Sequence, residues 1–328
     1  NLNSRVRRID LNLERNIQGF NKLSANYCRL RALRQTLKSE CPEVVIAFIH
    51  SNIVLTILAS FGLPVKVFGS ERSNPMRKNS ANFSLKFLRR LLYRFAKGHI
   101  SQTQQTKIWL KRYIGARNIH VIPNPIVWPI PNSSPVLVPE KILPSDRKVI
   151  LAVGTNPKIK GFDLLIRAFG EIKKNWPMWD LVIIGVDEKT DSVKGGASVK
   201  RLAEKLNLTK NLYMPGQVGN MIDWYKRADL FILSSRFEGF PNVLLEAMAS
   251  GCPSIAFNCE TGPSEIINNG VNGLLVHKES VEGLRIAMQN LMRDEILRKK
   301  FGSSAVKVRD KFSNDRILEK WLNVLQRA

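Results

Sequence analysis

Glu238 and Glu246 lie eight positions apart in the stretch FEGFPNVLLEAMASG, residues 237–251. A Gly, a Pro and an Asn stand between them, and the residues that follow have the apolar spacing of a helix that Gly251 closes. The first turn of a helix presents free backbone N–H groups, which can hold a phosphate without any Lys or Arg. A carboxylate one turn inside that helix can accept two hydroxyls. Together the two glutamates favour a ligand that carries a phosphate and has hydroxyls at both ends.

Two acids at this spacing also fit a simpler interpretation, in which Glu238 is a solvated loop residue and Glu246 caps a helix. The place of the stretch in the chain favours ligand binding. Residues 229–235 have the composition of a buried strand, so the residues that follow form a loop at its carboxyl end. Ligands of parallel α/β sheets bind at that edge.

Short runs rich in β-branched residues alternate with longer amphipathic segments, which indicates parallel sheets covered by helices. The runs expected to be strands are 43–50, 64–71, 98–103 and 118–124 in the first part, and 148–154, 180–185, 211–216, 229–235, 252–257 and 272–276 in the second. Helices are expected at 161–175, 197–206, 220–227 and 242–250. The fold class is therefore α/β, with two Rossmann-like domains that bind a ligand in the cleft between them.

A proline-rich stretch separates the two series of strands, since residues 123–146 contain seven prolines and no helical period. We expect an N-terminal domain over 1–130, a linker over 131–146, a C-terminal domain over 147–312 and a terminal helix over 313–328. The terminal helix is expected to pack back on the first domain.

The net charge of +24 is concentrated in the first domain, where residues 1–130 hold 22 Lys and Arg against 5 Asp and Glu. This imbalance predicts an anionic partner. Zinc-finger, helix-turn-helix and RNA-binding signatures are missing from the sequence, so nucleic acid is not the expected partner. No apolar run reaches the about 20 residues that a membrane-spanning helix needs.

The four cysteines, Cys28, Cys41, Cys252 and Cys259, lack the spacing of metal ligands or of a redox pair. We expect reduced thiols, two of them buried, in a reducing cytosol. The sequence also lacks a DxD motif and any His, Cys, Asp and Glu cluster with metal spacing, which predicts a site without a metal.

The stretch around the two glutamates resembles the E-x7-E motif of retaining glycosyltransferases of family 4, which have the GT-B fold of two Rossmann-like domains facing each other across a cleft. The resemblance extends over most of the chain, through VIPNPI, ILAVGTNPKIKGFDLLIRAF, LYMPGQVGNMIDWYKRADLFILSSRFEGFPNVLLEAMASGCPSIA and TGPSEIINNGVNGLLV. It points to relatives that build bacterial surface polysaccharides and lipopolysaccharide.

The resemblance implies a role for each residue that matches the family motifs. Glu246 would hold the ribose hydroxyls of a nucleotide sugar, Glu238 would contact the sugar near its reacting carbon, and Lys160 would neutralise the diphosphate leaving group. The donor-binding residues implied are Glu246, Gly239, Phe240, Pro241, Asn242, Val243, Thr155, Gly154 and Gly216. The nucleotide sugar is a substrate, so no cofactor is implied.

The chain departs from the family pattern at two places. Thr155 stands where the family has the Arg of GRL, and a hydroxyl cannot screen a phosphate charge. The family normally opens with a glycine-rich strand-loop-helix, and this chain resembles one that begins about 50–60 residues later, either as a fragment or with a truncated first domain.

An acceptor side is implied at the strand ends of the first domain. ERSNP, residues 71–75, is similar to the SERNxP-like stretch of surface-polysaccharide enzymes, which makes Arg72 a candidate catalytic residue that faces phosphate or acceptor. His50, at the end of a predicted strand, and Asn52 join Arg72 on this side. A structural alternative is that Glu71 and Arg72 pair with each other.

Residues 84–98, SLKFLRRLLYRFAKG, read as a basic amphipathic helix. Leu85, Leu88, Leu92 and Phe95 fall near one face, with Lys86, Arg89, Arg90, Arg94 and Lys97 around them. Such a helix suits an anionic membrane surface, and the resemblance implies a peripheral protein on the inner face of the plasma membrane. An ordinary cover helix with a solvated cationic face is the alternative.

The resemblance implies a retaining, metal-independent transfer of a hexose or N-acetylhexosamine from a nucleotide diphosphate sugar, expected to be a UDP-sugar. The acceptor would be a glycan or a lipid-linked molecule such as a polyprenyl diphosphate. The alternative is a catalytically impaired, truncated relative that binds nucleotide sugar or acts as a membrane or partner module; Thr155 favours it, while Glu238, Glu246 and Lys160 oppose it. A nucleotide-sugar epimerase would need more acid and His groups around the sugar.

Overall fold

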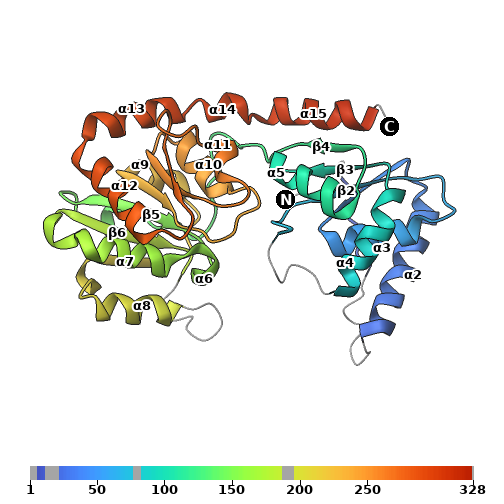
Figure 1. The fold of residues 1–328 in the computed structure, drawn as a ribbon, viewed down its shortest axis with the longest axis horizontal. Helices are drawn as coiled ribbons and strands as arrows, with labels where there is room; N and C mark the ends of the chain where they lie inside the picture. The colour runs from blue at the N-terminus through green and yellow to red at the C-terminus, as the bar shows by residue number, and fades with distance from the viewer. Residues whose placement is uncertain (1–5, 12–21, 77–82, 187–195, 327–328) are drawn as a thin grey trace. The chain divides into compact units, whose positions relative to one another are not determined.

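The computed structural model describes residues 6–11, 22–76, 83–186 and 196–326, and it divides into two compact units (Figure 1). The first unit comprises Asn1–Val121 together with Asn323–Ala328, and the second is Ile122–Leu322. Each unit has its own parallel sheet and its own apolar core.

The first unit contains a sheet in which sequence neighbours pair, in the order β1-β2-β3-β4. Its strands are β1 Val44–Phe48, β2 Lys66–Glu71, β3 Gly98–Ser101 and β4 Ile119–Val121. Its helices are α2 Lys22–Glu40, α3 His50–Ser60, α4 Phe83–Leu92 with a 3-10 turn Tyr93–Phe95, and α5 Gln104–Trp109 with a π turn Leu110–Ile114. All strand pairs are parallel, as the alternation of runs predicts.

The second unit contains a parallel sheet of six strands in the order β10-β9-β8-β5-β6-β7. The strands are β5 Lys148–Val153, β6 Trp179–Ile184, β7 Leu212–Gly216, β8 Leu230–Leu233, β9 Ser254–Asn258 and β10 Leu274–His277. After β7 the chain returns to the other side of β5, so the direction of winding reverses between β5 and β8. The loops that leave the carboxyl ends of these two strands diverge there, which is where doubly wound sheets bind ligands.

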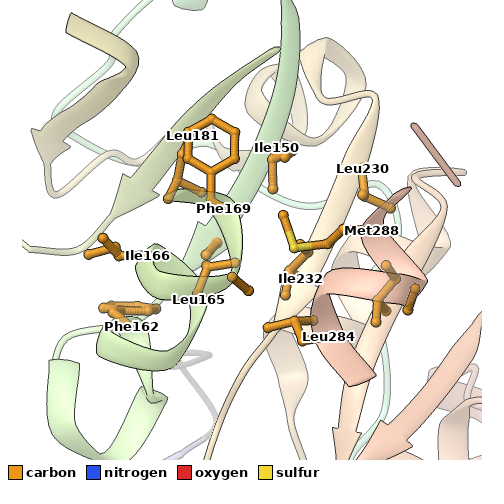
Figure 2. Close-up of a cluster of buried hydrophobic side chains, with 14 of the residues drawn as sticks. Ile150, Phe162, Leu165, Ile166, Phe169, Leu181, Leu230, Ile232, Leu284 and Met288 are labelled. Atoms are coloured by element: carbon orange, nitrogen blue, oxygen red, sulfur yellow. The ribbon is translucent and has the colours of Figure 1, made fainter. Parts of the chain in front are cut away.

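Helices cover both faces of the second sheet. The helices of the second unit are α6 Pro157–Lys160, α7 Phe162–Ile172, α8 Gly196–Lys205, α9 Met221–Arg227, α10 Asn242–Ala249, α11 Pro263–Ile266, α12 Val281–Arg293, α13 Glu295–Ala305 and α14 Val308–Lys311, with 3-10 turns at Pro139–Lys141, Lys173–Asn175 and Thr209–Asn211. The last helix, α15 Asn314–Gln326, begins in the second unit, and its residues from Asn323 on belong to the first. Alternate residues of β5 enter two clusters, Ile150 and Ala152 on one face and Val149 and Leu151 on the other. Figure 2 shows the first cluster, in which side chains of α7 and α12 cover the strands.

Residues 131–146, expected to be a linker, pack on the second unit instead. The Ser133 amide donates to the carbonyl of Gly219 at 2.9 Å. The buried Asn220 side chain accepts from the Leu137 amide at 2.9 Å and donates to the Leu137 carbonyl at 3.0 Å, and the Trp224 indole donates to the same carbonyl at 2.9 Å. Prolines prevent this segment from forming a long helix, but backbone groups of Ser133, Pro135 and Leu137 pair with residues at and just before the start of α9. The division between the units falls at Val121/Ile122.

Helix α4 differs from the expected amphipathic helix at Arg89. This residue is 1% exposed, and its Nη2 donates to Oε1 of the buried Glu71 at 2.7 Å. The Tyr93 hydroxyl donates to the same oxygen at 2.6 Å. The prediction of an exposed Arg89 is therefore wrong, because this side chain compensates a carboxylate buried at the end of β2. Glu71 therefore pairs with Arg89 and Tyr93.

The four cysteines are free thiols, and Cys252 and Cys259 are buried, as predicted. Burial raises the pKa of the Cys259 thiol to about 12, so it stays protonated. Within the described ranges, no helix is both long and apolar enough to cross a membrane.

Candidate active site

Lys160 and Glu238, 78 residues apart in sequence, meet at the point where β5 and β8 diverge. Lys160 ends the short helix α6 that follows β5, and Glu238 lies in the loop that follows β8. Lys160 Nζ is 2.7 Å from Glu238 Oε1, and the two side chains are 20% and 10% exposed. The parallel topology explains the meeting, since the carboxyl ends of neighbouring strands share one edge of the sheet.

Two glycines leave room for Lys160. Gly154 directly follows β5, and a Cβ there would lie 2.5 Å from Lys160 Cγ, so the lysine stem lies against bare backbone. Gly161 has φ +62°, and a Cβ there would lie 2.1 Å from the Ser234 carbonyl oxygen. The Ser234 hydroxyl donates to the Lys160 carbonyl at 2.8 Å. Glycine is thus required at 161 both by the left-handed conformation and by the approach of β8.

Two short polar residues hold Glu238. The Ser235 hydroxyl donates to Glu238 Oε1 at 2.6 Å, and the Thr261 hydroxyl donates to the Glu238 backbone carbonyl. Oε1 therefore accepts from both Lys160 and Ser235. Sequence reasoning missed Ser235 and Thr261, because isolated hydroxyl residues in loops form no pattern.

Arg236 fastens the Glu238 loop to the segment that carries Lys160. Its guanidinium makes two hydrogen bonds of 2.7 Å to the Asp163 carboxylate, one of 2.8 Å to the Lys158 carbonyl and one of 3.1 Å to Glu279. Burial raises the pKa of Asp163, but the bonds and charge of Arg236 outweigh it and hold that pKa below its ordinary value. The bidentate geometry makes this a well-defined clamp.

Glycines lie at the carboxyl ends of β5, β6 and β7, on the same edge of the sheet as Lys160 and Glu238. Gly154 donates its amide to the Ile184 carbonyl at 2.9 Å, and Gly185 donates to the carbonyl of Gly216 at 2.7 Å. Gly185 and Gly216 have φ of +92° and +81°. A Cβ at 185 would lie 2.7 Å from the Gly154 oxygen. The sequence pointed to Gly154 and Gly216 but missed Gly185, although it also ends a predicted strand. Thr155 is exposed beside them.

The loop before α10 turns its apolar side chain inward. Phe240 is buried, with its ring 5.5 Å from that of Phe312. Only its backbone is then available to a ligand, as is that of Gly239. Pro241 lacks an N–H, and the exposed Asn242 accepts from the Asn124 side chain at 2.8 Å. Val243, half-buried, completes the first turn of the helix.

Glu246 lies one turn inside α10 and lines a cavity of about 370 Å³. The cavity is lined by Pro125, Ile126, Val127, Ile130, Pro131, Ser133, Val218, Gly219, Met221, Asn242, Leu245 and Glu246. Most of these residues have apolar side chains, and Glu238 is not among them. The Tyr225 hydroxyl donates to Glu246 Oε2 at 3.0 Å. Burial raises the pKa of Glu246, and the tyrosine hydrogen bond partly opposes this rise.

The three acceptor-side residues lie near the carboxyl ends of β1 and β2 in the first unit. Arg72 directly follows β2, and its guanidinium carbon is 5.3 Å from the centre of the Phe48 ring. Burial lowers the pKa of Arg72. His50 does not end a strand: β1 stops at Phe48, Ile49 has φ +71°, and His50 begins α3, two residues before the exposed Asn52.

The parts of the chain that the structure describes contain no group of three His, Cys, Asp or Glu side chains placed to hold an ion.

Relatives of this chain occur among bacterial sugar-transfer proteins. An uncharacterized glycosyltransferase of Haemophilus influenzae is 27% identical over 196 residues, which cover 60% of this chain and 54% of that protein, so the chain spans about half of its length. A Campylobacter jejuni protein is 24% identical over 307 residues, covering 93% of this chain and 80% of its own length. Its name is GalNAc-alpha-(1->4)-GalNAc-alpha-(1->3)-diNAcBac-PP-undecaprenol alpha-1,4-N-acetyl-D-galactosaminyltransferase.

The fold also has counterparts among solved structures. A crystal structure of HepE from Anabaena, in complex with UDP and glucose, superposes with a TM-score of 0.79 at 18% identity, covering 91% of this chain and 82% of that one. This likeness, together with the two parallel sheets, confirms the predicted α/β class and GT-B fold.

A model of one protein family covers the unit that holds the Lys160–Glu238 pair. The family described as Glycosyl transferases group 1 matches residues 136–308, more than half of the chain. The match includes all six strands of the second sheet and both glutamates. The expected resemblance to family 4 is confirmed, and the chain belongs to the glycosyl transferases group 1 family.

Proposed function

We propose that this protein is a retaining, metal-independent glycosyltransferase that uses a nucleotide diphosphate sugar, most simply a UDP-linked hexose or N-acetylhexosamine. The carrying observation is the Lys160–Glu238 pair at 2.7 Å where the sheet's winding reverses, followed by Glu246 in its own cavity. Lys160 and the N-terminus of α10 suit the diphosphate of such a donor, and the Glu246 carboxylate suits its ribose hydroxyls.

Each residue has a part in this proposal. Glu246 accepts the ribose hydroxyls, and the apolar side chains that line its cavity contact the base. When the donor binds, Lys160 pairs with the diphosphate in place of Glu238, and the Glu238 carboxylate then faces the sugar. Negative charge develops on the diphosphate as the glycosidic bond breaks, so a lysine and the first amides of α10 stabilise the leaving group. The leaving phosphate takes the proton of the acceptor hydroxyl on the same face of the sugar, which retains the anomeric configuration.

Thr155 supports a second candidate, a relative that binds nucleotide sugar but transfers it poorly. A hydroxyl donates one hydrogen bond to a phosphate but supplies no charge, whereas an Arg would supply both. Leaving-group stabilisation then depends on Lys160 and on backbone amides. Binding without turnover is the outcome that would select this candidate.

The acceptor in this proposal is a glycan or a polyprenyl-diphosphate-linked sugar used for surface polysaccharide. The name of the Campylobacter relative, which includes an undecaprenol diphosphate, supports a lipid-linked acceptor. His50, Asn52 and Arg72 lie at the ligand-binding edge of the first sheet and are proposed to face it. Arg72 supplies a cation for an acceptor diphosphate.

Helix α4 offers a surface for the membrane that carries such an acceptor. Phe87 is 61% exposed, and Leu88 and Leu91 are also exposed. The exposed cations beside them are Lys86, Arg90 and Arg94. Apolar side chains next to cations suit the interface of an anionic leaflet. We therefore propose that the protein is a peripheral protein of the cytoplasm, at the inner face of the plasma membrane.

Isothermal calorimetry with UDP, GDP and ADP, each with and without EDTA, tests the donor proposal. We expect one nucleotide to bind, without effect of EDTA, and Glu246→Ala to weaken it by about 1.5–3 kcal/mol, the worth of hydrogen bonds to a charged group. Glu204→Ala, which removes an exposed carboxylate of α8, is the control. If none of the three nucleotides binds, the proposal is wrong. If an NMR assay with the matching nucleotide sugar shows a product of retained anomeric configuration, the proposed retaining transfer is supported.

A further inference from the structure

The Glu246 carboxylate is held from behind by a tyrosine that the family motifs do not assign. Tyr225, on α9, is 1% exposed, and its hydroxyl lies 3.0 Å from Glu246 Oε2. Its ring packs edge-on against Phe231 of β8, with 5.9 Å between the ring centres. A ring enclosed in this way has one position, so its hydroxyl is a fixed donor.

We infer that Tyr225 is a positioning residue, which locks the Glu246 carboxylate so that its remaining lone pairs face the ribose hydroxyls in the cavity. This inference rests on the proposed function. A carboxylate has about four acceptor sites. The tyrosine occupies one on Oε2, which selects one side-chain conformation and leaves the other sites for the ligand.

The surroundings of Glu246 make such a donor necessary. The remaining residues that line its cavity are uncharged, so none of them offers a cation to a half-buried carboxylate. Burial raises the pKa of Glu246 and the Tyr225 hydroxyl lowers it. The pKa of Tyr225 itself is raised well above its ordinary value by burial and then by the charge of Glu246, so the hydroxyl keeps its proton and remains a donor.

Tyr225→Phe removes only the hydroxyl and keeps the packing of the ring. We expect UDP to bind about fivefold more weakly, the fold-change that one lost hydrogen bond of ordinary strength produces. The KM for donor should rise by the same factor while kcat at saturating donor stays unchanged, because the ribose does not react. Tyr213→Phe, in β7, is the matched control, since Tyr213 is a half-buried tyrosine of the same unit that does not line the cavity.

Two comparisons separate positioning from a general effect on the fold. The loss should vanish with 2′,3′-dideoxy-UDP, which lacks the hydroxyls that Glu246 accepts. It should also vanish in the Glu246→Ala background, because a residue that acts through the Glu246 side chain has nothing to orient there. Thermal unfolding of each variant establishes that the ring still packs.

Other results would overturn the inference. Equal weakening for UDP and dideoxy-UDP, or additive losses in the double variant, would mean that Tyr225 acts on the fold and not through the carboxylate. Unchanged UDP affinity in Tyr225→Phe would remove any role for the hydroxyl. Failure of the unmodified protein to bind UDP, GDP or ADP would instead overturn the proposed function, and the inference with it.

Discussion

At the scale of single residues, the space beside Lys160 matters as much as its charge. The lysine stem occupies the position that a side chain at 154 would take, 2.5 Å from its Cγ. The backbone at 154 has no positive φ, so alanine is allowed there by conformation and excluded only by the lysine. The glycine at this strand end therefore serves the placement of a cation.

Gly154→Ala should displace Lys160 and weaken UDP binding by roughly ten- to hundredfold, the effect of losing a hydrogen bond to a charged group. UMP, which lacks the second phosphate, should lose less. Calorimetry with both nucleotides measures the difference. Gly170→Ala is the control, because its new methyl would approach only leucine tips at 3.3 Å or more. Equal losses for UDP and UMP would contradict the role of Lys160 at the diphosphate.

The ionisation of Glu246 makes a second prediction at this scale. Burial raises its pKa, and the ionised carboxylate is a much stronger acceptor of hydroxyls than the protonated form. Nucleotide affinity should therefore be complete above the raised pKa and fall as the pH drops through it, at a higher pH than for an ordinary glutamate. The pH dependence of UDP affinity is measured for the parent and for Glu246→Gln, because the phosphates of UDP also titrate. The difference between the two proteins should shrink in acid, and a constant difference would argue against this role.

At the scale of elements, the clamp formed by Arg236 joins three segments of the second unit. It connects the loop after β8 to the carbonyls of α6, to Asp163 at the start of α7 and to Glu279 after β10. The backbone amide of Arg236 adds a bond of 2.8 Å to the Ile159 carbonyl. The bond between Arg236 and the Lys158 carbonyl thus fixes the distance between Glu238 and Lys160, since each partner lies two residues from one of them.

Asp163→Asn should lower the melting temperature at neutral pH by about 2–4 °C, the shift that about 1 kcal/mol produces in a unit of this size. The pKa of Asp163 is depressed in the folded state, so its contribution is present above the unfolded pKa and is lost as the pH falls through the folded pKa. The gap between variant and parent should close in acid. Glu282→Gln, which breaks an exposed pair with Arg285, should change little at any pH.

The sequence predicted elements better than contacts, and the reasons are physical. The strands show as β-branched runs because parallel strands are buried on both faces, and Lys160 and Glu238 stand in motifs at strand ends. Arg236 and Tyr225 do not stand out, since a lone charge in a loop and an aromatic in a helix have ordinary structural uses. Arg89 was misread because the helical period cannot reveal a buried carboxylate on a neighbouring strand.

At the scale of the whole molecule, charge is divided unequally along the chain. Residues 1–130 hold 22 basic against 5 acidic side chains, out of 51 and 27 in the chain. In α4, the exposed phenylalanine and leucines are flanked by three of these cations. Net charge attracts an anionic surface over a distance, while apolar side chains retain the protein once it arrives.

Replacing Lys86, Arg90 and Arg94 with Gln should therefore weaken binding to phosphatidylglycerol vesicles at low salt, and the difference from the parent should shrink as salt screens the attraction. Each cation near an anionic surface contributes about 1 kcal/mol, so the triple variant should bind at least tenfold more weakly. Phe87→Ser with Leu91→Ser should weaken binding at every salt concentration, because it removes the apolar part.

A control variant with the same loss of charge separates vesicle binding through α4 from attraction by net charge alone. Replacing Lys174, Lys205 and Lys210, exposed cations of the second unit, with Gln removes the same charge from elsewhere. If vesicle binding comes from α4, this control should bind nearly as well as the parent in a sedimentation assay. If both triple variants lose vesicle binding equally, the attraction comes from net charge and not from α4. If the α4 triple variant binds vesicles like the parent, α4 is an ordinary cover helix with a solvated cationic face.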